Sequence, residues 1–240
     1  MGHAAEVPLV IVACGSYSPI TYLHLRMFEM AKDWVVEDGR FELMGCYFSP
    51  VSDAYNKPGL ASWHHRVAMC ERGVAQSSDI MVDPWEASRK AYQRTTLVLD
   101  HFEYEINTVR DGVALAAHKG ARESDAPSPR RRVRIMLLAG GDLIQSFAVP
   151  NLWAKADLDA ILGNFGCIII ERTGSDVHDF LLSNDHLHRH RRHVFVVKQF
   201  IHNDISSTKI RLFVQRGMSI KFLLPDQVID YIEAHALYRK

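Results

Sequence analysis

The chain has 240 residues, 48% of them hydrophobic, which suits one α/β domain or two small ones and provides enough apolar surface for a buried core. Its 28 lysines and arginines balance its 28 aspartates and glutamates, so no overall field draws it toward nucleic acid or a membrane surface. Four widely spaced cysteines form no CxxC pair, and neither a signal-like start nor a long apolar run occurs, so we expect an intracellular protein, cytoplasmic or nuclear.

Short apolar runs, each followed by a segment of helical period, predict βα units that feed a mostly parallel sheet. The predicted strands are Leu9–Cys14, Phe41–Phe48, Ile80–Val82, Val133–Ala139, Cys167–Glu171 and Val194–Val197. The predicted helices are a segment containing Leu23 to Trp34, then Ser62–Ala75, Ala87–Thr108, Ile205–Arg216 and Asp226–His235. We therefore expect one Rossmann-like α/β domain over residues 1–240, with helices on both faces of the sheet and a C-terminal helical segment.

Residues 117–132, "AHKGARESDAPSPRRR", interrupt this pattern. The stretch is polar, contains two prolines and a glycine, and has no buried face, so it predicts a flexible surface loop. Strands resume directly afterwards, which places the loop inside one domain. The basic end of the loop suits a solvated edge better than a nuclear address or a nucleic-acid contact.

Residues 13–25, "ACGSYSPITYLHL", pass from a buried strand through a glycine turn into a helix. Ligands of open parallel sheets gather beyond the carboxyl ends of the strands, where a helix start directs N–H groups and a positive dipole at them. Gly15 permits close backbone approach, Ser16 adds a hydroxyl, and His24 lies in the first helical turn. The stretch is typical of phosphate binding, or of an ordinary βα turn with a satisfied histidine. Neither GxGxxG nor GxxxxGK[ST] is present.

A second stretch, "NDISSTKIR" at residues 203–211, strengthens the phosphate interpretation. Its helix start offers hydroxyls from Ser206, Ser207 and Thr208, the ammonium of Lys209 and the guanidinium of Arg211. Together with free backbone N–H groups, these suit one polyanion. A capped helix with two solvated basic residues is the alternative for this stretch alone.

The TxxH that follows "GSYSPIT", and the ISSTxxR at Ile205 to Arg211, resemble the paired signatures of the nucleotidylyltransferase superfamily. Within it, the chain resembles the eukaryotic nicotinamide mononucleotide adenylyltransferases over nearly its whole length. Further stretches that carry the resemblance are "SPVSDAYNKPGL", "HRVAMCE", "VDPWE", "GGDLIQSFAVPNLW" and "LLPDQVIDYI". The resemblance implies transfer of AMP from ATP to nicotinamide mononucleotide, and also to nicotinate mononucleotide, with release of pyrophosphate.

The same resemblance implies which residues hold ATP. The implied ATP-binding residues are Gly15, Ser16, Tyr17, His24, Ser207, Thr208, Lys209 and Arg211. Among them His24, Lys209 and Arg211 are the implied catalytic residues. We expect Mg²⁺ to arrive with ATP, held by phosphates and water, and we name no protein metal ligand.

At the mononucleotide end, the residues that the resemblance implies are Ser16, Tyr55, Lys57, Tyr92, Thr95, Gly140, Asp142, Leu152 and Trp153. Trp153 would stack on the pyridine ring, Lys57 would reach the phosphate and Asp142 would accept ribose hydroxyls. A core tryptophan, a solvated lysine and a helix cap are the respective alternatives. The expected partners are ATP and the two mononucleotides, not a membrane or nucleic acid, and we expect a homo-oligomer.

Several features depart from the family pattern or compete with it. Tyr92 stands where better-known animal members carry tryptophan, and Ser18 stands where asparagine is common. The segment "HLHRHRRH", residues 186–193, argues weakly for a metal because its arginines repel cations and no acidic partner is evident. The rival functions are another small-molecule nucleotidylyltransferase, such as a pantetheine-phosphate or cytidylyl enzyme, and a chaperone-like or nucleic-acid-binding protein with secondary catalysis.

Overall fold

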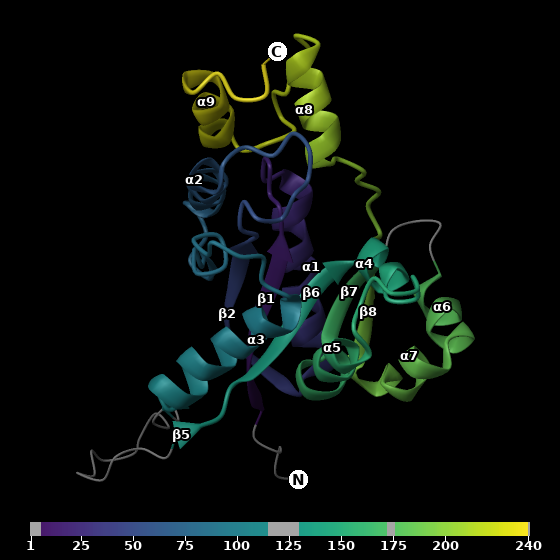
Figure 1. Ribbon diagram of the computed structural model, residues 1–240. Helices are drawn as coiled ribbons and strands as arrows, with labels where there is room; N and C mark the ends of the chain where they lie inside the picture. The colour runs from purple at the N-terminus through teal and green to yellow at the C-terminus, as the bar shows by residue number, and fades with distance from the viewer. Residues whose placement is uncertain (1–5, 115–129, 172–175, 240) are drawn as a thin grey trace, which may run out of the picture.

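The computed structural model describes residues 6–114, 130–171 and 176–239, and a six-stranded parallel sheet forms its centre (Figure 1). The strand order is β3-β2-β1-β6-β7-β8. The strands are β1 (Val7–Gly15), β2 (Phe41–Pro50), β3 (Ile80–Val82), β6 (Arg134–Gly140), β7 (Cys167–Glu171) and β8 (Val194–Lys198). All six predicted strands are confirmed, because strands covered on both faces read as continuous apolar runs.

Alternate residues of β1 face opposite sides of the sheet and pack in two separate hydrophobic cores. Leu9, Ile11 and Ala13 belong to the first core, whereas Val10 and Val12 belong to the second. This alternation follows from the two-residue period of a strand. The sheet therefore needs apolar helices on both faces, as the sequence predicts.

Helices supply both covers. The first core contains side chains from α1 (Tyr22–Asp38), α2 (Trp63–Val74), α8 (Ser207–Gln215) and α9 (Asp226–Ala234). The second contains side chains from α3 (Thr95–Glu103), α4 (Gly141–Ser146), α5 (Lys155–Asp159), the π-helical turn η2 (Ala160–Phe165), α6 (Val177–Ser183) and α7 (Asp185–Arg189). A second π-helical turn, η1 (Tyr104–Val109), continues α3, and the 3₁₀ turn η3 (Arg191–His193) follows α7. Figure 1 shows α8 and α9 together at one end of the molecule.

One predicted helix begins in the wrong place. The pattern predicts a helix over Ala87–Thr108, but α3 begins only at Thr95. The preceding residues form turns, in which Ser88 N–H donates to Pro84 and Arg89 N–H donates to Glu86. Ser88, Arg89 and Lys90 are exposed, so this stretch has no apolar face to hold a helix against the sheet.

The predicted loop at 117–132 is also wrong at its basic end. Arg130–Arg131 form strand β5, which pairs antiparallel with β4 (Val113–Ala114). Arg131 donates to Glu42 at 2.5 Å, and Arg132 pairs with Glu103. Arg130 and Arg132 are nevertheless exposed, so the basic end is a short paired strand whose side chains still face solvent. The rest of the predicted loop, residues 117–129, lies outside the described residues.

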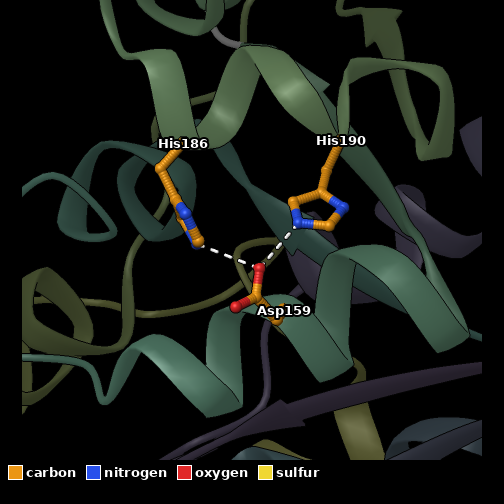
Figure 2. Close-up of side chains that lie close together, drawn as sticks. All are labelled: Asp159, His186 and His190. Carbon is orange, nitrogen blue, oxygen red and sulfur yellow. Dashed lines mark hydrogen bonds and ion pairs between the residues drawn. The ribbon is translucent and has the colours of Figure 1, made fainter.

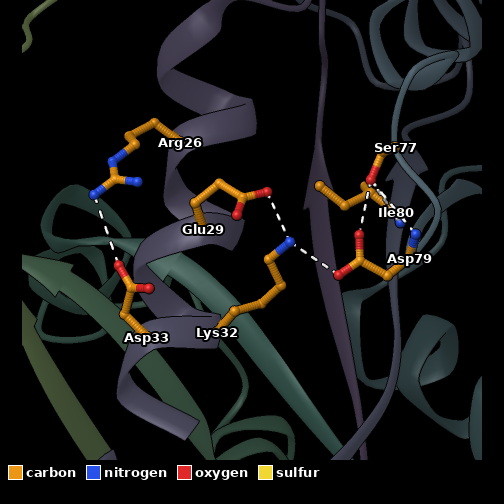
Figure 3. Close-up of polar contacts among 7 residues, drawn as sticks. All are labelled: Arg26, Glu29, Lys32, Asp33, Ser77, Asp79 and Ile80. Carbon is orange, nitrogen blue, oxygen red and sulfur yellow. Dashed lines mark hydrogen bonds and ion pairs between the residues drawn. The ribbon is translucent and has the colours of Figure 1, made fainter. Parts of the chain in front are cut away.

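An ion-pair network fastens α1 to the segment that leads into β3 (Figure 3). Lys32 Nζ lies 2.8 Å from Glu29 and 2.9 Å from Asp79, and the Ser77 hydroxyl donates to Asp79 at 2.8 Å. These contacts lower the pKa of Asp79, the hydrogen bond from Lys32 being the largest cause, so its carboxylate stays ionised. The network positions α1, whose first turn carries His24, relative to the sheet.

Candidate active site

The strand order reverses at β1, because β2 follows β1 on one side while β6 lies on the other. In open α/β sheets this reversal opens a crevice at the carboxyl ends of the strands. A cavity of about 250 Å³ lies there, between the ends of β1 and β6 and the starts of α1 and α4. The predicted site residues that line it are Gly15, Ser16, Tyr17, His24, Gly140 and Asp142.

The turn after β1 is shaped by Tyr17. Its φ is +44°, and its hydroxyl donates to the carbonyl of Ala13 at 2.8 Å, so the ring folds back over the end of β1. A Cβ on Gly15 would lie 2.8 Å from Tyr17 Cζ, and only glycine fits beneath this ring. The Tyr17 side chain is buried and shapes the turn, and the residue also lines the cavity.

His24 is held by the residue that starts its helix. Thr21 N–H donates to His24 Nδ1 at 3.0 Å, and Thr21 Oγ1 lies 2.8 Å from the same nitrogen. Because Nδ1 accepts, Nε2 carries the proton of the neutral ring and is its donor. The imidazole also packs edge-on against Tyr17, with ring centroids 5.2 Å apart. The ring is therefore oriented at the cavity wall by three contacts from the same turn.

The start of α8 is bonded to the turn after β1. Ser207 Oγ donates to the carbonyl of Pro19 at 2.8 Å, and Arg211 Nη1 donates to the carbonyl of Ser18 at 2.8 Å. Arg211 is buried, 9% exposed, so its charge is held beside the turn. The two sequence signatures thus meet, although neither Ser207 nor Arg211 lines the cavity itself.

Lys209 and Thr208 lie on the exposed side of the same helix start. Lys209 Nζ is paired with Asp204 at 2.5 Å, and Thr208 Oγ1 accepts from Arg211 at 3.4 Å. The Ser206 side chain caps the helix by accepting from Lys209 N–H. The Lys209 ammonium is therefore paired with Asp204 at the surface and does not line the cavity.

On the predicted mononucleotide side, two phenol rings stack. Tyr55 and Tyr92 have centroids 5.7 Å apart and planes 28° apart, and both rings are exposed. Burial of part of its ring raises the pKa of Tyr92, so its phenol stays protonated. Lys57 lies exposed in the turn beside Tyr55, and Thr95 begins α3. These four residues lie outside the cavity between β1 and β6.

Trp153 is half-buried and held by two contacts. Its Nε1–H donates to Ser146 Oγ at 3.0 Å, and its ring meets Phe147 edge-on at 4.9 Å. The neighbouring Leu152 is exposed. The Trp153 ring thus packs against the second core and is still partly exposed.

Arg66 is a central residue to which sequence reasoning assigned no role. Its side chain is fully buried and donates to the carbonyls of Ala61 and Ser16 and to the carboxylate of Asp53, at 2.9, 3.1 and 2.9 Å. It therefore joins α2 to the phosphate turn. The stretch "HRVAMCE" could have indicated this role, because an arginine on the apolar face of a helix requires buried partners.

Glu86 is the second residue without a predicted role. Its carboxyl is buried, and burial raises its pKa to about 7 although the Ser49 hydroxyl donates to it at 2.6 Å. Ser49 lies near the carboxyl end of β2, the strand beside β1, so its hydrogen bond to Glu86 holds that strand end in place. The nearby Trp85 stacks on His101 with ring centroids 4.2 Å apart, and the guanidinium of Arg89 lies over its ring, so Trp85 packs this segment against α3.

A larger cavity of about 650 Å³ lies beside the Lys32 network, and Tyr22 is the one residue of the two signatures that lines it among the described residues. It is bordered by Ser77 and Asp79, which precede β3, whereas ligands of this fold bind beyond strand ends. Among the described residues, no helix is long and apolar enough to span a membrane.

A parallel sheet with covered faces, a glycine turn, and a switch-point cavity lined in part by Ser16, His24 and Asp142 define a nucleotide-binding α/β protein of the Rossmann-like class. Residues 12–213 match the cytidylyltransferase-like family model. The chain is 57% identical, over 97% of its length, to nicotinamide/nicotinic acid mononucleotide adenylyltransferase 1 of Saccharomyces cerevisiae. It is 38% identical, over 99% of its length, to the protein of that name in Bos taurus.

The chain belongs to the nicotinamide/nicotinic acid mononucleotide adenylyltransferase family, within the cytidylyltransferase-like group. It spans 91% of the Bos taurus relative but only 56% of the Saccharomyces cerevisiae relative. A solved Vibrio parahaemolyticus protein, provisionally named as a nicotinate-nucleotide adenylyltransferase, has the same fold, with a TM-score of 0.57 at 12% identity. The match covers 98% of this chain and 97% of that one.

Proposed function

We propose that this protein transfers AMP from ATP to nicotinamide mononucleotide, and also to nicotinate mononucleotide, forming NAD or deamido-NAD and pyrophosphate. The observation that carries the proposal is the junction of two phosphate signatures. His24 lines the switch-point cavity, and Ser207 and Arg211 hydrogen-bond the turn that leads to it. The names of the relatives agree with this activity.

The reaction needs positioning more than proton transfer. The phosphate of the mononucleotide is already ionised near neutral pH, attacks the α-phosphorus of ATP, and displaces pyrophosphate in line. His24 donates from Nε2 to the leaving phosphates, while Lys209 and Arg211 offset their growing charge. Gly15, Ser16 and the backbone of Tyr17 hold the nucleotide phosphates. Burial raises the pKa of the Cys14 thiol, so this cavity-lining group is no nucleophile.

Mg²⁺ arrives with ATP and neutralises phosphate charge when bound. Asp142 is the one carboxylate among the described residues that line the cavity, so the protein supplies no cage of carboxylates there. This donor set fits an ion held chiefly by phosphates and water. Ser207 and Thr208 complete the hydroxyl contacts of the triphosphate tail.

The acceptor lies toward α4 and the segment before α5. Trp153 stacks on the pyridine ring, Leu152 borders it, and Asp142 beside Gly140 accepts ribose hydroxyls. Tyr55, Tyr92 and Thr95, which lie outside the cavity between β1 and β6, contact the acceptor from another side, and Lys57 binds the mononucleotide phosphate. Because a stacking platform does not distinguish carboxamide from carboxylate, both acceptors react.

The deciding experiment mixes the protein with ATP, Mg²⁺ and either mononucleotide, and separates dinucleotide and pyrophosphate by chromatography. Formation of both products from both acceptors supports the proposal. Absence of dinucleotide with either acceptor contradicts it, and a hundredfold preference contradicts the shared-acceptor part.

The protein is further proposed to be a homo-oligomer of the cytoplasm or nucleus. Phe200 and Ile201 are 94% and 78% exposed, beside an apolar cavity of about 740 Å³, which is a surface that self-association would cover. Sedimentation of the purified protein measures its mass in solution, and a monomer at high concentration contradicts this state. A fluorescent fusion distinguishes the two compartments.

A further inference from the structure

Two histidines and one aspartate converge on the side of the molecule where α5 meets α7 (Figure 2). His190 Nε2 lies 2.8 Å from Asp159 Oδ1, and His186 Nε2 lies 3.5 Å from the same oxygen. One ligand atom from each residue falls within 4.8 Å of the other two. The sequence shows no acidic partner for these histidines, and the fold supplies one in Asp159.

The local structure explains the convergence. His186 and His190 are four residues apart, so the helical turns of α7 and its C-cap place both rings on one side. Asp159 ends α5 and faces them from the opposite element (Figure 2). All three side chains are partly buried, 20%, 17% and 44% exposed, so the ligand atoms are sheltered without being closed off.

The donor set suits a borderline transition metal. Two imidazole nitrogens and a carboxylate oxygen are ligands of zinc, and pairs of histidines four apart on a helix are a recurring zinc-binding arrangement. Atoms bound to one tetrahedral zinc lie about 3.3 Å apart, given bonds of about 2.0–2.1 Å. The observed separations need only side-chain adjustment to reach that geometry. A water would take the fourth position.

One atom of the cluster also lacks a hydrogen bond. His186 Nε2 is shielded from solvent and has no hydrogen-bond partner among the described residues. A bound cation would satisfy this nitrogen, whereas a polar atom left unpaired in a shielded place is unfavourable. Asp159 at 3.5 Å is too distant to do so.

The neighbouring arginines do not fill the cluster. Arg189, Arg191 and Arg192 are exposed, and Arg191 donates to the carbonyl of His188. None of the three cluster residues lines the cavity between β1 and β6. The cluster is therefore separate from the proposed nucleotide site.

We propose that Asp159, His186 and His190 bind one Zn²⁺ ion, which fastens α7 to the end of α5. The ion adds no step to AMP transfer. Its effect is to hold two surface helices together, because binding to the folded chain alone stabilises the folded state. The proposal does not depend on the proposed enzymatic function.

The test uses the full chain without a histidine tag and without nucleotide, titrated with Zn²⁺ in a calorimeter. We expect one tight equivalent per chain and a higher melting temperature with zinc. H186A, H190A and D159N should each weaken this binding at least tenfold. His188→Ala is the matched control, since His188 belongs to the same helix but not to the cluster, and it should bind zinc as the wild type does.

Two further measurements distinguish loss of zinc binding from loss of folding. Asp159→Asn keeps an oxygen that accepts from His190, so circular dichroism should show a folded protein that has lost only zinc affinity. Co²⁺ in place of Zn²⁺ should give the visible absorption of a low-coordinate site in the wild type but not in H186A/H190A. The proposal is overturned by a wild type that binds no single zinc equivalent, or by an H186A/H190A protein that binds zinc unchanged.

Discussion

The guanidinium of Arg66 donates to the carbonyl of Ser16, 50 residues earlier in the chain, at 3.1 Å. The same side chain holds Ala61 and Asp53, and none of it is exposed. One buried cation thus ties three segments around the phosphate turn. Removing such a buried charge while its partners remain is strongly destabilising, because the partners are left buried without a hydrogen bond.

Replacing Arg66 with methionine is expected to lower the free energy of unfolding by about 3–5 kcal/mol, since carbonyls and a carboxylate lose their donor. Urea denaturation measures the change. Arg66→Lys, which keeps the charge but not the planar fork, should recover part of the loss. A methionine variant within about 1 kcal/mol of the wild type would show that water replaces these hydrogen bonds.

His24→Ala should lower turnover roughly 10²–10³-fold, about 3–4 kcal/mol, as expected for loss of one preorganised donor. The variant also loses the contact with Thr21, so its free energy of unfolding should fall by about 0.5–2 kcal/mol, as for the loss of a helix cap. His65→Ala is the control, because His65 contacts Tyr231 and does not line the cavity. It should lose stability and keep turnover. Near-normal turnover in folded His24→Ala would contradict the assignment.

Lys209 can be replaced to test its role in turnover with little effect on the stability of the fold. Its ion pair with Asp204 is exposed, and such pairs contribute about 0–1 kcal/mol. Lys209→Ala should therefore lower turnover at an unchanged melting temperature. Asp204→Asn frees the ammonium for the triphosphate, so its KM for ATP should stay equal or fall. A raised KM in Asp204→Asn would instead mean that the pair itself orders the start of α8.

Trp153→Ala should raise KM for the mononucleotide about tenfold, since base–aromatic stacking is worth about 1–3 kcal/mol, with a smaller effect on ATP. Trp153→Phe should recover much of the affinity. Ser146→Ala removes only the partner of Nε1 and tests whether that hydrogen bond orients the ring. Equal damage to both KM values in Trp153→Ala would make this residue part of the core.

The pKa of Glu86 predicts how stability depends on pH. Burial raises it from 4.5 to about 7, so above about pH 4.5 the unfolded chain releases a proton that the folded chain retains. The contribution of Glu86 is complete at low pH and is lost as pH rises through about 7. The expected loss is about 3 kcal/mol at most.

Urea denaturation of the wild type and of Glu86→Gln, from about pH 5 to about pH 8, isolates this effect. Glutamine keeps an acceptor for Ser49 but does not ionise, so the wild type should weaken relative to the variant as pH rises. Parallel curves would show that Glu86 ionises freely in the folded protein.

The strands and the phosphate turn were predictable because both depend on local sequence. β1 and β7 are apolar runs of the kind that only a covered parallel strand needs, and Gly15 with Ser16 follows the first directly. The true start of α3 at Thr95 was not, because the preceding residues are held in turns by backbone hydrogen bonds such as that from Ser88 to Pro84, which residue types do not reveal.

Contacts between distant segments could not be predicted either. The pairing of Arg211 with the carbonyl of Ser18 spans 193 residues and involves a backbone group, which leaves no trace in residue types. Asp159 is one acid among many until α5 and α7 pack together and bring it 2.8 Å from His190. Such neighbours follow from topology, not from spacing.

The bonds from Ser207 and Arg211 to the turn after β1 also set the order in which a newly made chain becomes competent. The turn leaves the ribosome long before its donors, because Ser207 and Arg211 follow their acceptors by 188 and 193 residues, and Tyr238, the partner of the Ser18 hydroxyl, follows by 220 residues. An incomplete chain therefore has a turn without its supports. Stalled nascent chains of increasing length should gain ATP affinity only once Arg211 has left the exit tunnel, so that translation itself delays nucleotide binding until about 190 residues after the turn have been made.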